Sequence, residues 1–143
     1  RQPLASLTER PLPMPVITLM SPDPGPGRPA LARVAEAVTG LLGIPAEHCW
    51  VLWQRLDADA AHRPDWRDDG SPCAPVGFVT CKETYPKELV SELLLLLRDE
   101  LSTLLAVPAD EVYLVVRRAV PGELLVRGNV WQGDAKVPAP TGS

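Results

Sequence analysis

The chain has 143 residues, of which 45% are hydrophobic and 22% are charged, and its formal net charge is −4 at pH 7. This length and composition suit one globular domain with a real core. With no basic stripe, nucleic acid is not an expected partner. No apolar run reaches the ~18–20 residues of a membrane span, and the start of the sequence lacks the features of a secretory signal. We therefore expect a cytoplasmic protein without a membrane partner.

The number and spacing of the cysteine and histidine residues do not predict a metal site. The three cysteines, Cys49, Cys73 and Cys81, are odd in number and lack metal-ligand spacing. Cys49 and Cys81 stand in apolar surroundings, which indicates buried, reduced thiols and a reducing compartment. No cluster of histidine, cysteine and carboxylate predicts zinc, and we expect neither a metal nor an organic cofactor.

A proline-rich start precedes the first predicted strand and helix. Residues 1–14 show no sustained hydrophobic period and are expected to form an extended arm. Pro15–Leu19 is predicted as a strand, and residues 21–27 as a loop rich in proline and glycine. The following helix, Pro29 to about Leu42, has apolar residues every three or four positions and ends at Gly43.

His48–Leu56 is the second predicted strand. Its dense apolar run predicts burial on both faces, as in a covered parallel sheet. Residues 57–74 are polar and rich in turn residues, so we expect a link that could hold a short hairpin.

The second half of the chain repeats this order. Val76–Cys81 is predicted as a strand, and a helix capped by Thr84 or Tyr85, with Pro86 in its first turn, is expected to reach about Leu105. A last long strand covers Val112–Val120. After a Pro-Gly turn, residues 124–126 are expected to return as a short hairpin, and residues 135–143 to form a frayed tail.

The two halves match residue by residue. Ile44–Arg55 aligns with Val107–Arg118 without a gap, at an offset of 63 from position 44 to position 107. Each first strand opens with Pro-Val, at Pro15 and at Pro75. A repeat of this kind fixes the architecture before any propensity is counted. We predict a single domain over residues 15–143, with repeats at about 15–72 and 73–134.

Each repeat is a strand–helix–strand unit, whose crossover is right-handed and whose two strands are therefore parallel. Two such units side by side predict an α+β fold with a four-stranded sheet and two helices on one face. The other sheet face would then be apolar and uncovered, which a soluble monomer tolerates poorly. We therefore expect an oligomer that buries this face.

With this repeat, the chain resembles the tautomerase superfamily from Pro15 to about Trp131. The motifs that carry the resemblance are Pro-Val at each strand start, Leu-Gly-Ile-Pro-Ala at residues 42–46 and Ala-Val-Pro-Ala at residues 106–109. Short members such as 4-oxalocrotonate tautomerase are single units. The length here resembles fused members such as cis-3-chloroacrylic acid dehalogenase and malonate semialdehyde decarboxylase, which implies a homotrimer.

The resemblance implies a catalytic N-terminal proline. In the family its secondary amine, freed by removal of the initiator methionine, has a lowered pKa and works as a general base or acid. Met14-Pro15 has the form of such a start, yet thirteen residues precede Met14. Pro15 is thus the expected catalyst only where it is N-terminal. Within a longer chain its nitrogen is an amide and cannot exchange a proton.

The resemblance also implies cations that hold a substrate carboxylate, because a guanidinium matches carboxylate geometry. Arg28 stands where the family has a Gly-Arg at the mouth of the first helix, with a solvated loop arginine as the alternative. Lys82 and Tyr85 stand where fused dehalogenases have paired arginines, so one cation remains of two. Trp50 and Tyr113 align with a further family arginine; either they pack at a core or interface, or they line a pocket for an apolar substrate.

Three further candidates lie near the strand ends. Arg117 is a possible substrate ligand, although Arg117 and Arg118 together read more simply as a solvated pair, of which alternation turns one inward. Glu123 is the carboxylate nearest to the position of the water-activating acid of fused dehalogenases. His48 is expected to be a plain surface histidine rather than a base.

Two functions remain open at this point. The first is cofactor-free proton transfer, or a related rearrangement, on a small carbonyl, enol or carboxylate compound, with Pro15 and the nearby cations in the roles given above. The second is a non-catalytic binding or scaffold protein whose Pro15 is blocked by residues 1–14.

Overall fold

The computed structural model describes residues 15–133, so the expected arm (1–14) and tail (135–143) lie outside the described residues. The elements, in chain order, are β1 (Val16–Ser21), α2 (Arg28–Leu42), η1 (Ala46–His48), β2 (Trp50–Arg55), η2 (Ala58–Ala60), β3 (Val76–Lys82), α3 (Lys87–Leu105), η3 (Ala109–Glu111), β4 (Tyr113–Ala119), β5 (Leu125–Val126) and β6 (Asn129–Val130).

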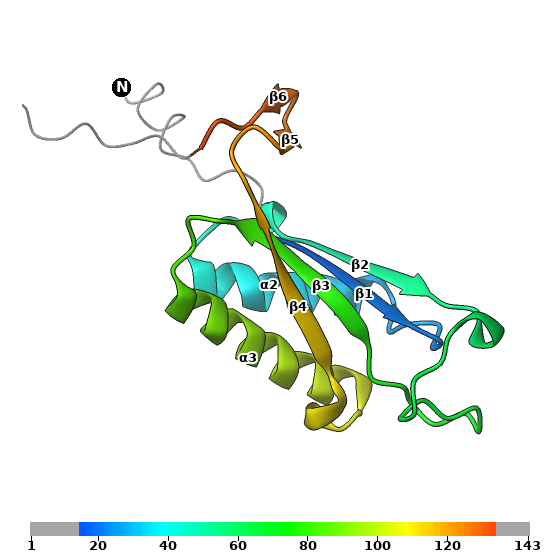
Figure 1. Ribbon diagram of the computed structural model, residues 1–143. Coiled ribbons are helices and arrows are strands. Elements are labelled where there is room, and N and C mark those ends of the chain that lie inside the picture. Colours follow the sequence, from blue (N-terminus) through cyan, green and yellow to red (C-terminus); the bar gives the residue numbers. More distant parts are fainter. Residues whose placement is uncertain (1–14, 134–143) are drawn as a thin grey trace, which may run out of the picture.

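A four-stranded mixed sheet carries both helices on one face (Figure 1). Its strand order is β2-β1-β3-β4, with β1 parallel to β2, β3 parallel to β4, and β1 antiparallel to β3. The two parallel pairs are the two repeats, and the antiparallel contact joins them. The predicted fold class is confirmed.

The repeat extends to individual backbone bonds. The Trp50 amide donates to the Pro15 carbonyl at 3.2 Å, and the Tyr113 amide donates to the Pro75 carbonyl at 3.3 Å. A one-turn 3-10 helix precedes the second strand of each unit, at η1 and at η3. The two halves are therefore duplicated units that share one hydrogen-bond plan.

The core lies between the sheet and the two helices. Alternation along β1 turns Ile17 and Leu19 toward the helices, where both are fully buried, and leaves Val16, Thr18 and Met20 on the open face. Burial is the main stabilising term, at about 25 cal/mol per Å² of apolar surface. The buried core cluster comprises Ile17, Leu19, Val34, Val38, Cys49, Val79, Leu93, Leu97 and Leu101.

The prediction that β2 is buried on both faces is wrong for the chain by itself. Trp50 and Leu52 on the open face are 55% and 50% exposed, whereas Val51 and Trp53 pack toward the helices. One register row across all four strands is Leu52, Thr18, Phe78 and Val115. The apolar run of β2 therefore places apolar side chains on an uncovered face of the sheet, and no second layer within the described residues covers that face.

Both helices end where a residue takes the left-handed conformation. Gly43 (φ 68°) ends α2 as predicted, and Ala106 (φ 55°) ends α3. The expected cap of α3 at Thr84 or Tyr85 is wrong, because Pro86 is the N-cap residue, with extended dihedrals and no side-chain bond. Proline has its φ fixed near the helical value and lacks an N–H, so it suits this boundary.

The C-terminal hairpin also differs from the prediction. Residues 124–126 do not return along β4; instead β5 pairs with β6 in a separate two-stranded sheet. Arg127 and Gly128 between them both have positive φ, at 53° and 81°, which is the geometry of a tight hairpin turn. In residues 57–74 the structure shows η2 and turns, without the hairpin that the link could have held.

The three cysteines are free and buried, as the sequence predicts for Cys49 and Cys81. Burial raises the pKa of Cys49 from 9.0 to about 12, and burial also raises the pKa of Cys73 and Cys81. As the pH rises, the Cys49 thiol loses its proton in the unfolded state before it does so in the folded state. The contribution of this thiol to the free energy of unfolding is therefore present below about pH 9 and is lost as the pH rises toward 12.

We therefore expect none of the three thiols to react with an aromatic disulfide reagent at pH 8 in the folded protein, and all three to react in guanidinium chloride. Absorbance of the released thiolate counts the reactive groups. Rapid labelling of Cys49 in the folded protein would contradict its burial in the core.

Candidate functional site

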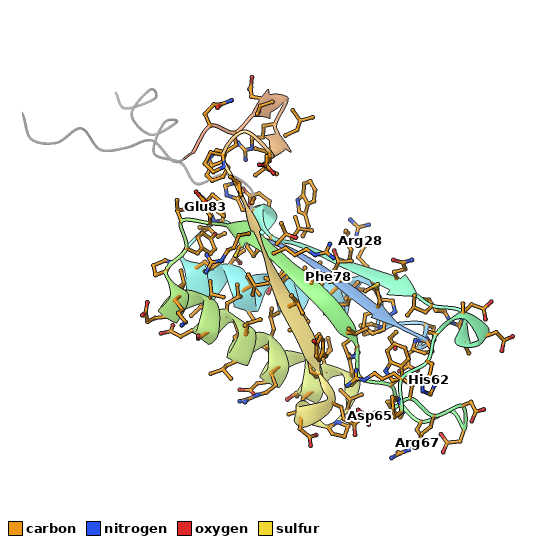
Figure 2. The ribbon with its side chains drawn as sticks, in the orientation of Figure 1. Arg28, His62, Asp65, Arg67, Phe78 and Glu83 are labelled. Atoms are coloured by element: carbon orange, nitrogen blue, oxygen red, sulfur yellow. The ribbon has the colours of Figure 1, made fainter. Side chains whose placement is uncertain are left out.

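The antiparallel contact between the repeats gives the sheet two distinct ends. Pro15, before β1, lies at the same end as Lys82, the last residue of β3, whereas Pro75 lies at the end where β1 finishes. Figure 2 shows Glu83, which follows β3, far from Asp65 and Arg67 in the link between the repeats. The two prolines therefore head two separate regions of the molecule.

At the first end, Pro15 is fully buried between two neighbouring strands. Lys82 is the last residue of β3 and is only 5% exposed. Its Nζ atom lies 6.0 Å from the ring centroid of Tyr85 and 6.0 Å from that of Trp131, within cation–π range. A buried lysine is rare in proteins unless it is paired or serves a function.

His48, just before β2, lies on the other side of Pro15. The expectation of a surface histidine is wrong, because His48 is only 2% exposed, and the turn of the β5–β6 hairpin contacts it. Arg127 at the hairpin turn lies with a guanidinium nitrogen 3.1 Å from His48 Nε2. A guanidinium can only donate, so Nε2 accepts and the ring hydrogen belongs on Nδ1. That Nδ1 has no hydrogen-bond partner within residues 15–133.

Trp131 follows the hairpin and folds back toward the sheet. Its carbonyl accepts from the Gly122 amide at 2.7 Å, and its amide donates to the Leu124 carbonyl at 2.8 Å. The side chain is 5% exposed, and its indole Nε1 lacks a partner in the described part of the chain. We refer to this group as the Pro15 cluster: Pro15, His48, Lys82, Tyr85, Arg127 and Trp131.

At the Pro75 end, side chains of the link between the repeats bond to backbone carbonyls. The Trp66 indole donates to the Ala74 carbonyl at 2.7 Å, and Arg63 donates to the same carbonyl at 3.3 Å. Arg63 also donates to the Glu111 carbonyl and contacts the Trp66 ring at 5.8 Å. These side chains therefore stabilise the junction of the repeats, and Arg63 and Trp66 also line a cavity of about 470 Å³ at this end.

Arg117 and Arg118 lie on opposite faces of β4, as alternation predicts. Arg117 stacks on the Phe78 ring at 3.5 Å on the open face. Arg118 donates to the carbonyls of the loop after β3, with bonds of 3.2 Å to Lys82, 3.3 Å to Glu83 and 2.8 Å to Tyr85. Instead of being a purely solvated pair, one arginine covers an aromatic ring and the other fixes the loop that carries Lys82 and Tyr85.

The remaining predicted residues lie outside this cluster, and two of them, Arg28 and Trp50, line one groove. Trp50 lies beside the cluster on the open face, in register with Val16, and Glu123 is exposed in the turn before β5. Arg28 begins α2 (Figure 2). It lines a groove between α2 and β2. Tyr113 is 59% exposed and lies next to Pro75. Within one chain, Lys82 and Tyr85 lie within cation–π range of each other and at the same end of the sheet as Pro15, whereas Arg28 and Tyr113 lie elsewhere.

Two classes of function gain no support from the described residues. Between residues 15 and 133, no three histidine, cysteine or acidic side chains come together in a way that could hold a metal ion. Neither of the helices there has the length and hydropathy required to cross a bilayer.

Comparison with known proteins identifies the fold. No family model and no curated protein sequence matches this chain. Among solved structures, a native fused 4-OT has a TM-score of 0.69 and 18% identity over 80% of this chain and 94% of its own. A member of the cis-3-chloroacrylic acid dehalogenase family has a TM-score of 0.63 and 15% identity over 83% and 85%. A macrophage migration inhibitory factor of Toxoplasma gondii has a TM-score of 0.59 and 18% identity over 81% and 99%.

Proposed function

We propose that this chain, which has the fold of the tautomerase superfamily, binds a small carbonyl, enol or carboxylate compound at the Pro15 cluster. We further propose that it transfers a proton on that compound once the Pro15 nitrogen is free. The observation that supports this best is that Pro15, Lys82 and His48, all three buried, lie at the same end of the sheet. No metal or organic cofactor enters this chemistry.

The residues divide into two roles. Lys82 supplies a cation for a carboxylate or enolate oxygen, in a buried site where a charge acts more strongly than in water. The rings of Tyr85 and Trp131 beside it provide an apolar wall. A free Pro15 amine in this position would favour its neutral form, because burial opposes a positive charge, as does the Lys82 cation at the same end of the sheet. A neutral amine is a general base.

The second candidate is a binding protein without proton transfer. Met14 precedes Pro15 in this sequence, and an amide nitrogen has no basic lone pair. The single lysine where the resemblance implies two cations also favours binding without turnover. In that case the same residues would hold an enolic molecule and could direct its rearrangement.

The state of the Pro15 nitrogen separates the two candidates. We expect a preparation translated from Met14, with its methionine removed, to ketonise phenylenolpyruvate at least about 100-fold faster than the full chain, the lower range for positioned acid–base catalysis. N-terminal sequencing of the protein from its native host then shows which form occurs. Equal, buffer-level rates from both folded preparations would refute proton transfer by Pro15 and leave the binding function.

We also propose that the protein is a homotrimer assembled through the open sheet face. The row Leu52, Thr18, Phe78 and Val115 crosses all four strands, and Leu52 and Val115 in it are 50% and 40% exposed. An apolar patch of this kind marks an interface. Solved structures with this fold include wild-type fused 4-OT trimers.

A further inference from the structure

Two buried N–H groups in the Pro15 cluster lack acceptors within residues 15–133, namely His48 Nδ1–H and Trp131 Nε1–H. Native proteins leave few buried polar groups unpaired, because each one loses its bonds to water without replacement. The other buried or half-buried indoles do not share this feature: Trp53 donates to the Asp23 carbonyl at 3.0 Å, and Trp66 to the Ala74 carbonyl at 2.7 Å. The unpaired donors are therefore concentrated at one end of the sheet.

The same hairpin holds both groups in place. Arg127 at its turn occupies Nε2 of His48, which directs the ring hydrogen to Nδ1. The backbone bonds of Trp131 to Gly122 and Leu124 fix the indole at the base of the hairpin. The Trp131 ring lies 6.0 Å from Lys82 Nζ, so one of the donors adjoins the buried cation.

We propose that His48 Nδ1–H and Trp131 Nε1–H are hydrogen-bond donors to the oxygen atoms of a small organic acid, with Lys82 supplying the positive charge. Two neutral donors and a cation suit the carboxylate and the adjacent carbonyl oxygen of a 2-oxo acid, because in this keto form both groups only accept hydrogen bonds. This rests on the proposed function and assigns to the site two residues that the resemblance does not imply.

The test is a titration of the ¹⁵N-labelled full chain with phenylpyruvate, followed at the indole N–H signals. We expect the Trp131 signal, assigned by its absence in Trp131→Phe, to move downfield. The signals of Trp53 and Trp66, which already have acceptors, should stay in place and serve as internal controls. 2-Phenylethanol, with the same ring but no acid, should move none of them.

Two substitutions at His48 distinguish the loss of the Nδ1 hydrogen-bond donor from the loss of the contact with Arg127. The amide nitrogen of His48→Asn falls near the position of Nδ1, whereas His48→Gln retains an acceptor for Arg127 and loses the Nδ1 donor. We expect His48→Gln and Trp131→Phe each to weaken phenylpyruvate binding about tenfold, as loss of one such bond implies. His48→Asn should remain close to the wild type.

The possible outcomes test the two donors separately from the proposed binding function. A wild-type chain that binds no phenylpyruvate would refute both. Wild-type binding that survives His48→Gln and Trp131→Phe, with no movement of the Trp131 signal, would refute this inference alone. A Trp131 signal that is immobile because a second copy of the chain already supplies its acceptor would refute it equally.

Discussion

Replacing Lys82 with methionine is expected to weaken phenylpyruvate binding by about 30-fold or more. Methionine keeps the length of the side chain and its contact with the rings of Tyr85 and Trp131 but removes the charge. A hydrogen bond to a charged group contributes about 1.5–3 kcal/mol, and about 2 kcal/mol corresponds to that change in affinity. Isothermal titration calorimetry of the full chain measures the effect.

Lys87→Met is the matched control. Lys87 lies five positions further along, at the start of α3, and is exposed. We expect it to bind like the wild type, and both variants to keep a cooperative thermal transition. Equal affinity in both variants would show that Lys82 does not face the ligand and would refute its role in the site.

Leu52→Glu and Val115→Glu are each expected to convert the oligomer into a monomer of 15.5 kDa. Both residues belong to the central row of the open face, where β2 and β4 are the outer strands. Burying an unpaired carboxylate in an apolar interface costs several kcal/mol, which exceeds what one side of a trimer contact can absorb. Sedimentation velocity at micromolar concentration reports the mass.

Leu95→Glu separates this effect from a general effect of adding charge. Leu95 is 51% exposed, nearly the same as Leu52, but it lies on α3 away from the sheet. We expect this variant to keep the oligomer. A wild-type chain that sediments as a monomer would contradict the interface itself, and dissociation by Leu95→Glu alone would place the interface on the helices.

The repeated units could be predicted because their signals are local. Helix periodicity and the Gly43 stop after α2 each depend on a few neighbouring residues. The match between the two halves depends on two short segments at a constant offset. The exposed face of β2 could not be predicted from β2 alone, because the run through Trp50 and Leu52 has the same composition whether or not a second layer of the chain covers it. The count of two helices for one sheet resolves that difference, and it correctly predicted an uncovered face.

The cluster around Pro15 was only partly predictable. Lys82 and Tyr85 were predicted from the resemblance to the tautomerase superfamily. The burial of His48 was not predicted, and the hairpin residue that contacts it, Arg127, is 79 residues away in the sequence. No local pattern reports such a contact. The one available signal was Gly128, because glycine suits the positive φ of a tight turn, and Arg127 stands directly before it. Trp131 had no signal beyond its residue type.

Whether the Pro15 end is the ligand site is tested most directly by a crystal structure of the full chain grown with phenylpyruvate. We expect the acid to lie against Lys82, with oxygen atoms within hydrogen-bond distance of His48 Nδ1 and Trp131 Nε1. Phenylpyruvate bound instead against Arg63 and Trp66 at the Pro75 end, or in the groove beside Arg28, would contradict this assignment.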